Sequence, residues 1–426
     1  MRLLSVILGL LGALLSLQAK EIFMAPNGDD AAAGTLDKPI ATLQKAQELA
    51  QPGDTIWLRG GTYKIAADYP VARKERIWVY LNYFNKSGKE QSPIRYWAYA
   101  DEHPIFDFSA VKPADVRINA FQVMGSWLHF RGIEIIGVQV NFKGHGQSCS
   151  IENHGSHNLF ERLSLHDSQA IGIYALSGSH NLFLNCDAYN NYDYTSEDHR
   201  GGNVDGFGCH PTKGSIDNVF RGCRAWFNSD DGYDCISAQE VVVFEQCWAM
   251  YNGYGTKFEK LGDGNGFKAG GYGATPVERL PKVIPRHIVR GCLAVHNKAN
   301  GFYANHHLGG GDWLYNSATG NGANFSFLER TPDNAKDIDG TGHLIQNNLA
   351  YKGRLVVHLA DDITGKPNTF SNGTKLLPET FVSLDEALLV GPRAADGSLP
   401  KTGFLQPKPE SKLLEFGYTA YVPASK

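Results

Sequence analysis

Four aspartates and one lysine in the middle of the chain have the types and spacing needed for metal-assisted proton transfer. Asp205 is followed by the run NSDDGYD, which contains Asp230, Asp231 and Asp234, and then by Lys268 in GNGFKAGG. Isolated Asp-Gly pairs are ordinary turn residues, but this run exceeds what a turn needs. Clustered carboxylates repel one another unless a proton or a metal neutralises them, and several flexible oxygen ligands suit calcium better than magnesium. We therefore predict a Ca2+ site.

A lysine beside such a site indicates that the site receives an anion. Calcium next to a lysine is what β-elimination of a uronate polysaccharide requires, because the metal binds the substrate carboxylate and stabilises the charge that develops at carbon 5. Lys268 would take the proton from carbon 5 as a neutral amine. The aspartates raise the lysine pKa, whereas calcium and desolvation lower it. We expect an alkaline activity optimum.

A repeated block predicts the elements that position these residues. Blocks of the form Cys-x-Ala-x-x-Asn begin at Cys186, Cys223, Cys247 and Cys292, each followed by an Asp-Gly or Asn-Gly pair. The bare period is 23–24 residues, and the segments are rich in β-branched and aromatic residues. This pattern is typical of an all-β parallel solenoid. An array of hairpins would instead need two-residue turn signals at regular spacing.

Stacking of the repeats aligns the acidic residues. Asp205 and Asp231 hold equivalent places in adjacent rungs, which puts them about 4.8 Å apart along the stack. Lys268 is the equivalent of Asp234 one rung further on. The block cysteines are expected to be small buried residues without a redox or metal role. The block asparagines should form an interior ladder of hydrogen bonds; they are Asn191, Asn228, Asn252, Asn297 and Asn321.

Residues 1–19 are typical of a secretory signal peptide, with Arg2, an apolar stretch from Leu3 to Leu15, and a plausible cleavage site after Ala19. We expect a secreted or periplasmic protein. Removing Arg2 with the leader changes the formal net charge from −4 to −5, so the overall charge favours neither nucleic acid nor an anionic membrane.

The chain has seven cysteines, an odd number, so they cannot all be paired in disulfides. Cys209 and Cys235 share a column of the stack and are the one conceivable disulfide. Free thiols are favoured there, because in-register strands hold the two side chains parallel.

Residues 20–426 are predicted to form a single solenoid domain, with rungs to about residue 350 and a tail that packs along the helix or caps it. The segment PIATLQKAQELAQPGDT predicts a short amphipathic helix that covers the N-terminal end of the stack. Solenoids need such caps because an exposed last rung is a pairing edge. No coiled-coil pattern or large apolar face is evident, and we expect a monomer.

The motifs VDGFG, CRAWFNSDDGYD and GDGNGFKAGG resemble polysaccharide lyase family 9, and the resemblance spans residue 22 to about 350. It implies a right-handed parallel β-helix and a calcium-dependent pectate lyase acting on polygalacturonate. It also implies that Asp205, Asp230, Asp231 and Asp234 are the calcium ligands and that Lys268 is the base. The family also includes rhamnogalacturonan lyases and lyases of other uronate polymers, which stay open as alternatives.

Two positions depart from the family pattern and indicate altered subsites. Gly208-Cys209-His210 stands where a lysine-leucine pair is common, and Tyr303 stands where aspartate is usual. Two insertions, residues 192–204 and 253–264, leave the stack near the catalytic column, so basic residues in or near them could reach substrate carboxylates. The candidates are Arg200, His210, Lys213, Lys257 and Tyr303.

Two other classes of function remain open from the sequence. A β-helical glycoside hydrolase would use two of the aspartates at a defined separation without a metal, and would leave Lys268 without a role. A non-catalytic solenoid would bind an acidic polysaccharide and use calcium to fasten its rungs.

Overall fold

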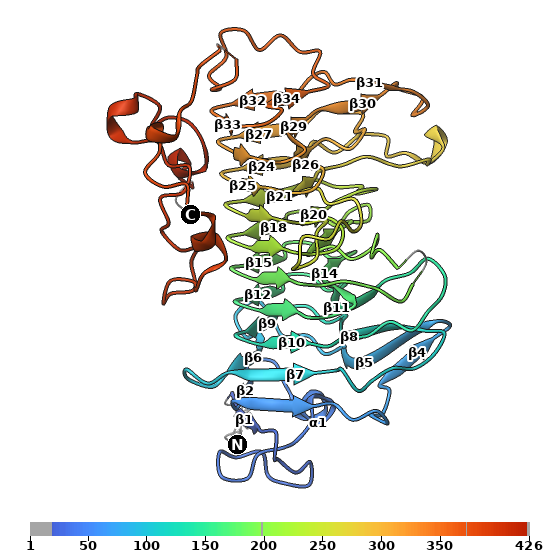
Figure 1. Ribbon diagram of the computed structural model, residues 1–426. Helices are drawn as coiled ribbons and strands as arrows, with labels where there is room; N and C mark the ends of the chain where they lie inside the picture. Colours follow the sequence, from blue (N-terminus) through green and yellow to red (C-terminus); the bar gives the residue numbers. More distant parts are fainter. Residues whose placement is uncertain (1–18, 197–198, 372, 424–426) are drawn as a thin grey trace, which may run out of the picture.

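The computed structural model describes residues 19–196, 199–371 and 373–423. From β1 to β34 (residues 21–357) the chain coils into an elongated stack of short strands, which Figure 1 shows rising from its N-terminal end. The described strands form three long sheets of 11, 10 and 11 strands, here named sheets 1, 2 and 3. Consecutive strands of one sheet belong to successive turns of the chain, and pairing is parallel except between β4 (Arg73–Glu75) and β5 (Trp78–Phe84).

Sheet 1 contains β1 (Glu21–Met24), β2 (Thr55–Leu58), β6 (Ile94–Ala98), β9 (Leu128–Arg131), β12 (Leu159–Glu161), β15 (Leu182–Leu184), β18 (Asn218–Arg221), β21 (Val242–Glu245), β24 (Ile288–Arg290), β27 (Asp312–Leu314) and β32 (Leu344–Gln346). Sheet 2 contains β3 (Gly61–Lys64), β7 (Pro104–Asp107), β10 (Glu134–Ile136), β13 (Ser164–His166), β16 (Asp187–Tyr189), β19 (Arg224–Trp226), β22 (Trp248–Met250), β25 (Leu293–Val295), β28 (Ser317–Thr319) and β33 (Leu349–Tyr351).

Sheet 3 begins with the antiparallel pair β4 and β5 and continues through β8 (Arg117–Val123), β11 (Ser148–Asn153), β14 (Ala170–Ala175), β17 (Phe207–Cys209), β20 (Tyr233–Asp234), β23 (Phe267–Lys268), β26 (Asn300–Tyr303), β29 (Ala323–Ser326) and β34 (Val356–Val357). A separate antiparallel pair is formed by β30 (Leu328–Arg330) and β31 (Asp337–Asp339). The helical segments are α1 (Leu43–Leu49) and the short 3-10 turns η1 (Val277–Arg279), η2 (Pro378–Thr380), η3 (Glu386–Val390), η4 (Pro409–Ser411) and η5 (Tyr418–Ala420).

The interior of the stack is filled by aromatic side chains that repeat once per turn. Alternation of side chains along each strand sends one residue of a three-residue strand inward, as in β15, where Phe183 is buried between half-buried neighbours. The inward rings of consecutive turns stack on one another at centroid distances of 4.3–5.4 Å. Two such columns are Phe130, Phe160, Phe183 and Phe220 in sheet 1, and Phe207, Tyr233, Phe267 and Phe302 in sheet 3.

The block asparagines form the predicted interior ladder. Asn228 Nδ2 donates to Asn252 Oδ1 at 3.0 Å, and Asn252 Nδ2 donates to Asn297 Oδ1 at 2.9 Å. The side chains of Asn252, Asn297 and Asn321 also accept the backbone N–H of the asparagine in the preceding turn, as Asn252 does from Asn228 at 3.2 Å. The ladder satisfies backbone groups at a buried bend, which would otherwise cost stability.

The N-terminal helix is present as predicted. The side chain of Thr42 caps α1 by accepting the N–H of Lys45 at 3.1 Å. The helix buries Leu43 and Ala46 against the first turns of the stack, and Figure 1 shows it at the N-terminal end. An apolar face of a short helix thereby covers interior side chains at the end of the stack.

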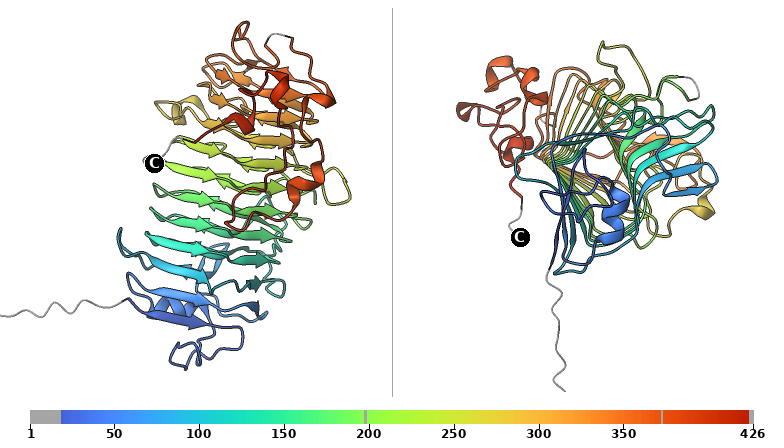
Figure 2. Two further views of the ribbon diagram at one scale, coloured as in Figure 1. Left: turned by 90° about the vertical axis from the view of Figure 1, so that its left-hand side faces the viewer. Right: turned by 90° about the horizontal axis from the view of Figure 1, so that it is seen from below.

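After β34 the chain turns back and runs along sheet 2, as Figure 2 shows from two sides. Phe381, Leu389 and Phe404 of this tail form a second apolar core with Trp226 and Trp248 of sheet 2. The two tryptophans therefore pack beneath the tail.

Charged groups fasten the same contact between the tail and sheet 2. Asp187 of β16 pairs with Arg224 of β19 at 2.7 Å and with Arg393 of the tail at 2.6 Å. Burial alone would raise the pKa of Asp187, but the hydrogen bonds and charges of the two arginines outweigh it and hold that pKa below its usual value.

Other expectations are met or lie outside the described part. All seven cysteines, Cys209 and Cys235 among them, are buried free thiols. The signal peptide predicted at residues 1–19 lies outside the described residues except for its last position. Within the described ranges, no helix has the length and apolar character to cross a membrane.

Candidate active site

One column of side chains on sheet 3 joins the predicted catalytic residues. Strand pairing places Asp234 directly opposite Lys268 in the next turn and Lys268 opposite Tyr303 in the turn after that. In the other direction Asp234 is opposite Gly208, and Gly208 is opposite Tyr174. The register predicted from the repeat is therefore correct: Asp234 and Lys268 are equivalent residues of adjacent rungs.

Three aspartates meet beside this column. Asp205, Asp231 and Asp234 each offer an oxygen within 4.8 Å of the other two, and all three residues are buried. The carboxylate of Asp231 is fixed by two hydrogen bonds: its Oδ1 accepts the backbone N–H of Asn265 at 2.6 Å and the Asn265 side-chain amide at 2.8 Å. Such a cluster of buried carboxylate oxygens has the chemistry of a site for a hard cation.

The electrostatics of the cluster show that negative charge is in excess. Burial raises the pKa of Asp205 well above its usual value, and the charges of Asp234, Asp230 and Asp231 raise it further. Burial likewise raises the pKa of Asp231, although Lys268 opposes that rise. Lys268 lies 3.1 Å from Asp231 Oδ2 and 3.1 Å from Asp234 Oδ2. Burial favours the neutral amine of Lys268, but the aspartate charges outweigh burial and raise its pKa.

Asp230 lies next to the three-carboxylate group but is held differently. Its side chain is buried, and its Oδ1 accepts the backbone N–H of Asp263 at 2.7 Å. Asp230 is not one of the three described residues whose oxygens converge within 4.8 Å. Its role as a fourth ligand stays a prediction. Asp263 belongs to the loop 253–264, so this insertion reaches the site as the sequence suggested.

Asn265 is a site residue that the sequence reasoning did not single out. It donates two hydrogen bonds to Asp231 and accepts two from Asn300, from the backbone N–H at 3.2 Å and from the side chain at 2.8 Å. Its signal was visible in the repeat, because Asn265-Gly-Phe occupies the place of Asp231-Gly-Tyr one rung later. A neutral donor at this position orients a carboxylate without neutralising it.

His210 lies beside the column, where Gly208 leaves room. Its Nδ1 is 2.7 Å from Ile236 O, and its ring is tilted against Tyr174 at 4.8 Å. Burial lowers the pKa of His210, which favours the neutral ring. A Cβ added at Gly208 would come within 2.5 Å of the Tyr174 ring, so Tyr174 occupies the space that a longer side chain at residue 208 would need.

The other candidate substrate-binding residues lie at different distances from the catalytic column. Tyr303 is half-buried next to Lys268, and burial raises its pKa to about 12. Arg200 is exposed in a loop that touches the site, since Ser229 Oγ donates to Gly201 O at 2.8 Å. Lys257 is exposed in the loop 253–264, and Lys213 lines a different cavity of about 670 Å3 with Arg279 and Lys282.

Comparison with known proteins decides the family. A family model described as "Pel9A-like, right handed beta helix region" matches residues 22–348. The chain belongs to this Pel9A-like family. The match confirms the predicted right-handed β-helix and the resemblance to polysaccharide lyase family 9.

Individual members of the Pel9A-like family are similar over most of the chain. Pectate lyase L of Dickeya chrysanthemi is 34% identical over 399 residues, which cover 93% of this chain and 85% of the relative. Pectate lyase PEL9 of Emericella nidulans is 31% identical, covering 91% and 92%. These relatives and the shared fold make this Pel9A-like protein a polysaccharide lyase.

Two solved structures are similar throughout the Pel9A-like fold. A rhamnogalacturonan lyase has 38% sequence identity and a TM-score of 0.88, with coverage of 94% of this chain and 100% of the other. Pectate lyase Pel9A has 31% identity and a TM-score of 0.73, with coverage of 93% and 91%.

Proposed function

We propose that the protein is a calcium-dependent lyase that cleaves a galacturonate-containing pectic polymer by β-elimination, with Lys268 as the base. The observation that carries this proposal is the position of Lys268 Nζ, 3.1 Å from both Asp231 and Asp234 on an outward-facing column of the stack. A lysine whose amine is that close to a group of metal-ligating carboxylates lies where a substrate carboxylate and its adjacent carbon 5 would arrive together.

The carboxylate group fits calcium. Oxygens of Asp205, Asp231 and Asp234 converge, and their burial together raises the pKa of two of them, which means that the site lacks positive charge. Asp230 is the proposed fourth ligand. Calcium supplies positive charge that attracts the substrate carboxylate and stabilises the negative charge formed when carbon 5 loses its proton.

Lys268 performs the proton transfer in this proposal. As a neutral amine it accepts the proton from carbon 5, and the electron pair of the carbon–hydrogen bond forms the double bond between carbons 4 and 5. The glycosidic oxygen leaves carbon 4 with the electron pair of its bond and takes up a proton from solvent. Asn265 and the backbone hold Asp231 in place while this occurs. Lys268 is mostly buried, with 12% of its side chain exposed.

Two pectic polymers are candidates, polygalacturonate and rhamnogalacturonan. The column around the base favours rhamnogalacturonan, because Gly208 stands where the family pattern commonly has a lysine and because the Tyr174 ring fills the space beside Gly208. A polymer with a carboxylate on every sugar would benefit from cations at successive positions, whereas a polymer with alternating neutral sugars would not. The similarity to a rhamnogalacturonan lyase over 94% of the chain also supports this choice.

The acidic polysaccharide is the proposed partner, and the protein is proposed to act as an exported monomer without nucleic-acid or membrane partners. A leader of the predicted type would place it in the periplasm or outside the cell, where pectic polymers are met. Amino-terminal sequencing of the mature protein should begin at Lys20, and an intact Met1 would contradict export by this route.

The test is to incubate the purified protein with each polymer, in calcium or in chelator, and to follow the ultraviolet absorbance of the unsaturated product. A calcium-dependent rise on one polymer, absent in Lys268→Ala, supports the proposal. New reducing ends without that absorbance would show hydrolysis. Polymer binding with no cleavage of any uronate polymer would show a binding protein.

A further inference from the structure

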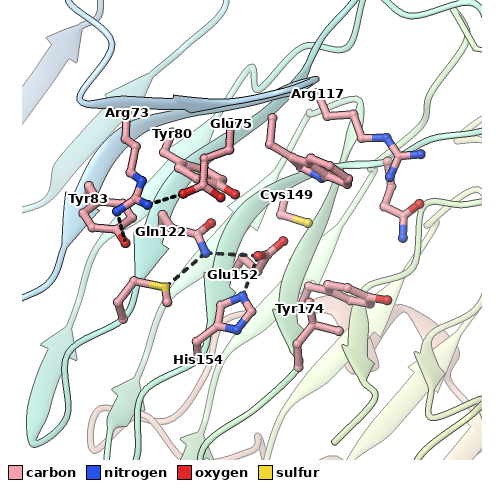
Figure 3. Close-up of a pocket in the computed structure, with 14 residues that line it drawn as sticks. Arg73, Glu75, Tyr80, Tyr83, Arg117, Gln122, Cys149, Glu152, His154 and Tyr174 are labelled. Atoms are coloured by element: carbon pink, nitrogen blue, oxygen red, sulfur yellow. Dashed lines mark hydrogen bonds and ion pairs between the residues drawn. The ribbon is translucent and has the colours of Figure 1, made fainter. Parts of the chain in front are cut away.

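A second concave site lies on the same sheet as the proposed catalytic column. It is a cavity of about 500 Å3 over β5, β8, β11 and β14, and Figure 3 shows the side chains that surround it. Strand pairing places β14 three strands from β23 and β8 five strands from it. With about 4.8 Å between neighbouring strands, the cavity begins about 14 Å from the strand of Lys268.

The lining combines aromatic rings with charged groups, as carbohydrate sites do. Trp78, Tyr80, Tyr83 and Tyr174 supply the rings. Tyr174 is the residue opposite Gly208 in the catalytic column, and the column runs on from Tyr174 to Glu152 and then to Gln122. The cavity and the proposed catalytic residues thus lie along one continuous line of side chains.

Most charges in the cavity are already paired within the protein. Arg73 forms an ion pair with Glu75 and donates to Tyr83 Oη at 3.1 Å. Glu152 is buried and accepts hydrogen bonds from Gln122 at 3.0 Å and Asn119 at 2.9 Å, and its Oε1 lies 2.7 Å from His154 Nε2. These interactions hold polar groups in fixed positions on the wall and leave little uncompensated charge there.

Arg117 differs from the other charged residues of the cavity. Its guanidinium lies over the rings of Trp78 and Phe142, with centroid distances of 5.5 and 5.8 Å, and Nη2 donates to His145 O at 2.6 Å. Among the residues that the structure describes, no carboxylate pairs with Arg117, and its buried Nε has no hydrogen-bond partner. A positioned arginine with unused N–H groups is suited to a planar carboxylate.

We propose that this cavity is a distal subsite for a uronate residue of the polymer, with Arg117 as the residue that recognises its carboxylate. The inference rests on the proposed function, since it assumes that the polymer follows sheet 3 from Lys268 toward the N-terminal end. Arg117 lies on a strand about 24 Å from that of the base, so only a chain of several sugars occupies both places. Long substrates gain affinity from Arg117 that short ones do not.

The matched control is Arg131, which lies over the ring of Trp97 at 3.7 Å on sheet 1, a different face of the stack. Both arginines would be changed to Met, which keeps an unbranched apolar side chain and removes the guanidinium and its charge. Polymeric rhamnogalacturonan and polygalacturonate are the probes. Their dissociation constants would be measured by titration calorimetry in a Lys268→Ala background, where no turnover consumes the polymer.

We expect Arg117→Met to raise the Kd of at least one polymer about tenfold, the loss of one charge-assisted hydrogen-bonding partner, and Arg131→Met to leave it unchanged. In the protein with Lys268, Arg117→Met should lower the ratio of kcat/KM for polymer to that for a tetrasaccharide by a similar factor. An unchanged Kd, or an equal change in both variants, overturns the subsite. Absence of unsaturated product from the unaltered protein would instead overturn the proposed function, because the Kd values report on the subsite independently.

Discussion

Lys268 and Asp234 are equivalent residues of adjacent turns, and their side chains meet at 3.1 Å on the outside of sheet 3. The same structural position therefore holds an anion in one turn and a cation in the next. Because the two charges are in direct contact, removing the charge of Lys268 or of Asp234 should change the proposed catalytic site without changing the stack of turns.

Replacing Lys268 with Ala should abolish elimination while the protein stays folded. General base catalysis contributes roughly 10²–10⁴-fold, so kcat on the cleaved polymer should fall by at least that factor. Lys336→Ala, which removes an exposed lysine outside the site, is the control and should retain full activity. A Lys268→Ala protein with ordinary kcat would contradict the assignment of the base.

Calcium should stabilise the folded protein through the three-carboxylate group. A ligand that binds only the folded state at 100 times its Kd stabilises it by about 2.7 kcal/mol, and thermal unfolding would show this as a higher Tm. Asp231→Asn should largely remove the shift, because it removes the charge of one of the three converging carboxylates. Asp217→Asn changes an exposed carboxylate and should leave the shift intact; an equal shift in all three proteins would place the metal elsewhere.

The asparagine ladder should contribute measurably to stability. Asn252→Ala removes the acceptor of the buried Asn228 backbone N–H, which is left unpaired, and leaves the Asn228 side-chain amide with only its hydrogen bond to Ala188 O. Such a loss costs about 1–3 kcal/mol, to be measured by denaturant unfolding. Asn27→Ala, at an exposed position, should change stability by less than about 0.5 kcal/mol. Equal effects of the two substitutions would argue against the ladder.

Acid should weaken the attachment of the tail through Asp187. Because the folded-state pKa of Asp187 is lowered, its contribution to stability is present above the unfolded pKa of about 3.9. That contribution is lost as pH falls through the lower folded-state value. Asp187→Asn should therefore be destabilised at neutral pH and should differ less from the unaltered protein at the acid end of a Tm series. A difference that is constant across pH would contradict this account.

The repeat alone was enough to predict the stack, its register and the facing pair of Asp234 and Lys268, because each turn copies the one before. The asparagine ladder followed for the same reason. The contacts between the tail and sheet 2 could not be predicted in this way, because the tail contains no repeat. Asp187 and Arg393 are far apart in the sequence, and nothing in the tail matches the repeat.

The cavity around Arg117 was also beyond sequence reasoning. It depends on the hairpin of β4 and β5, where Arg73 and Glu75 lie outside the repeated segment. Lys213 shows the converse difficulty: it follows the catalytic column closely in sequence, yet it lines another cavity. Lys213 lies in the turn between β17 and β18, where the repeat does not fix the direction of the chain, so the sequence could not assign its side chain to a face of the stack.

The returning tail changes how the molecule comes apart. A stack in which each turn touches only its neighbours opens by fraying from an end, one turn at a time. Here the segment after β34 is bonded to Asp187, many turns earlier, and covers Trp248 between the two. The last turns of the stack cannot separate until the tail has detached from sheet 2. A protease that attacks transiently opened ends would therefore need the tail and the last turns to unfold together. The tail thus couples the unfolding of distant turns in a structure whose other contacts join only neighbouring turns.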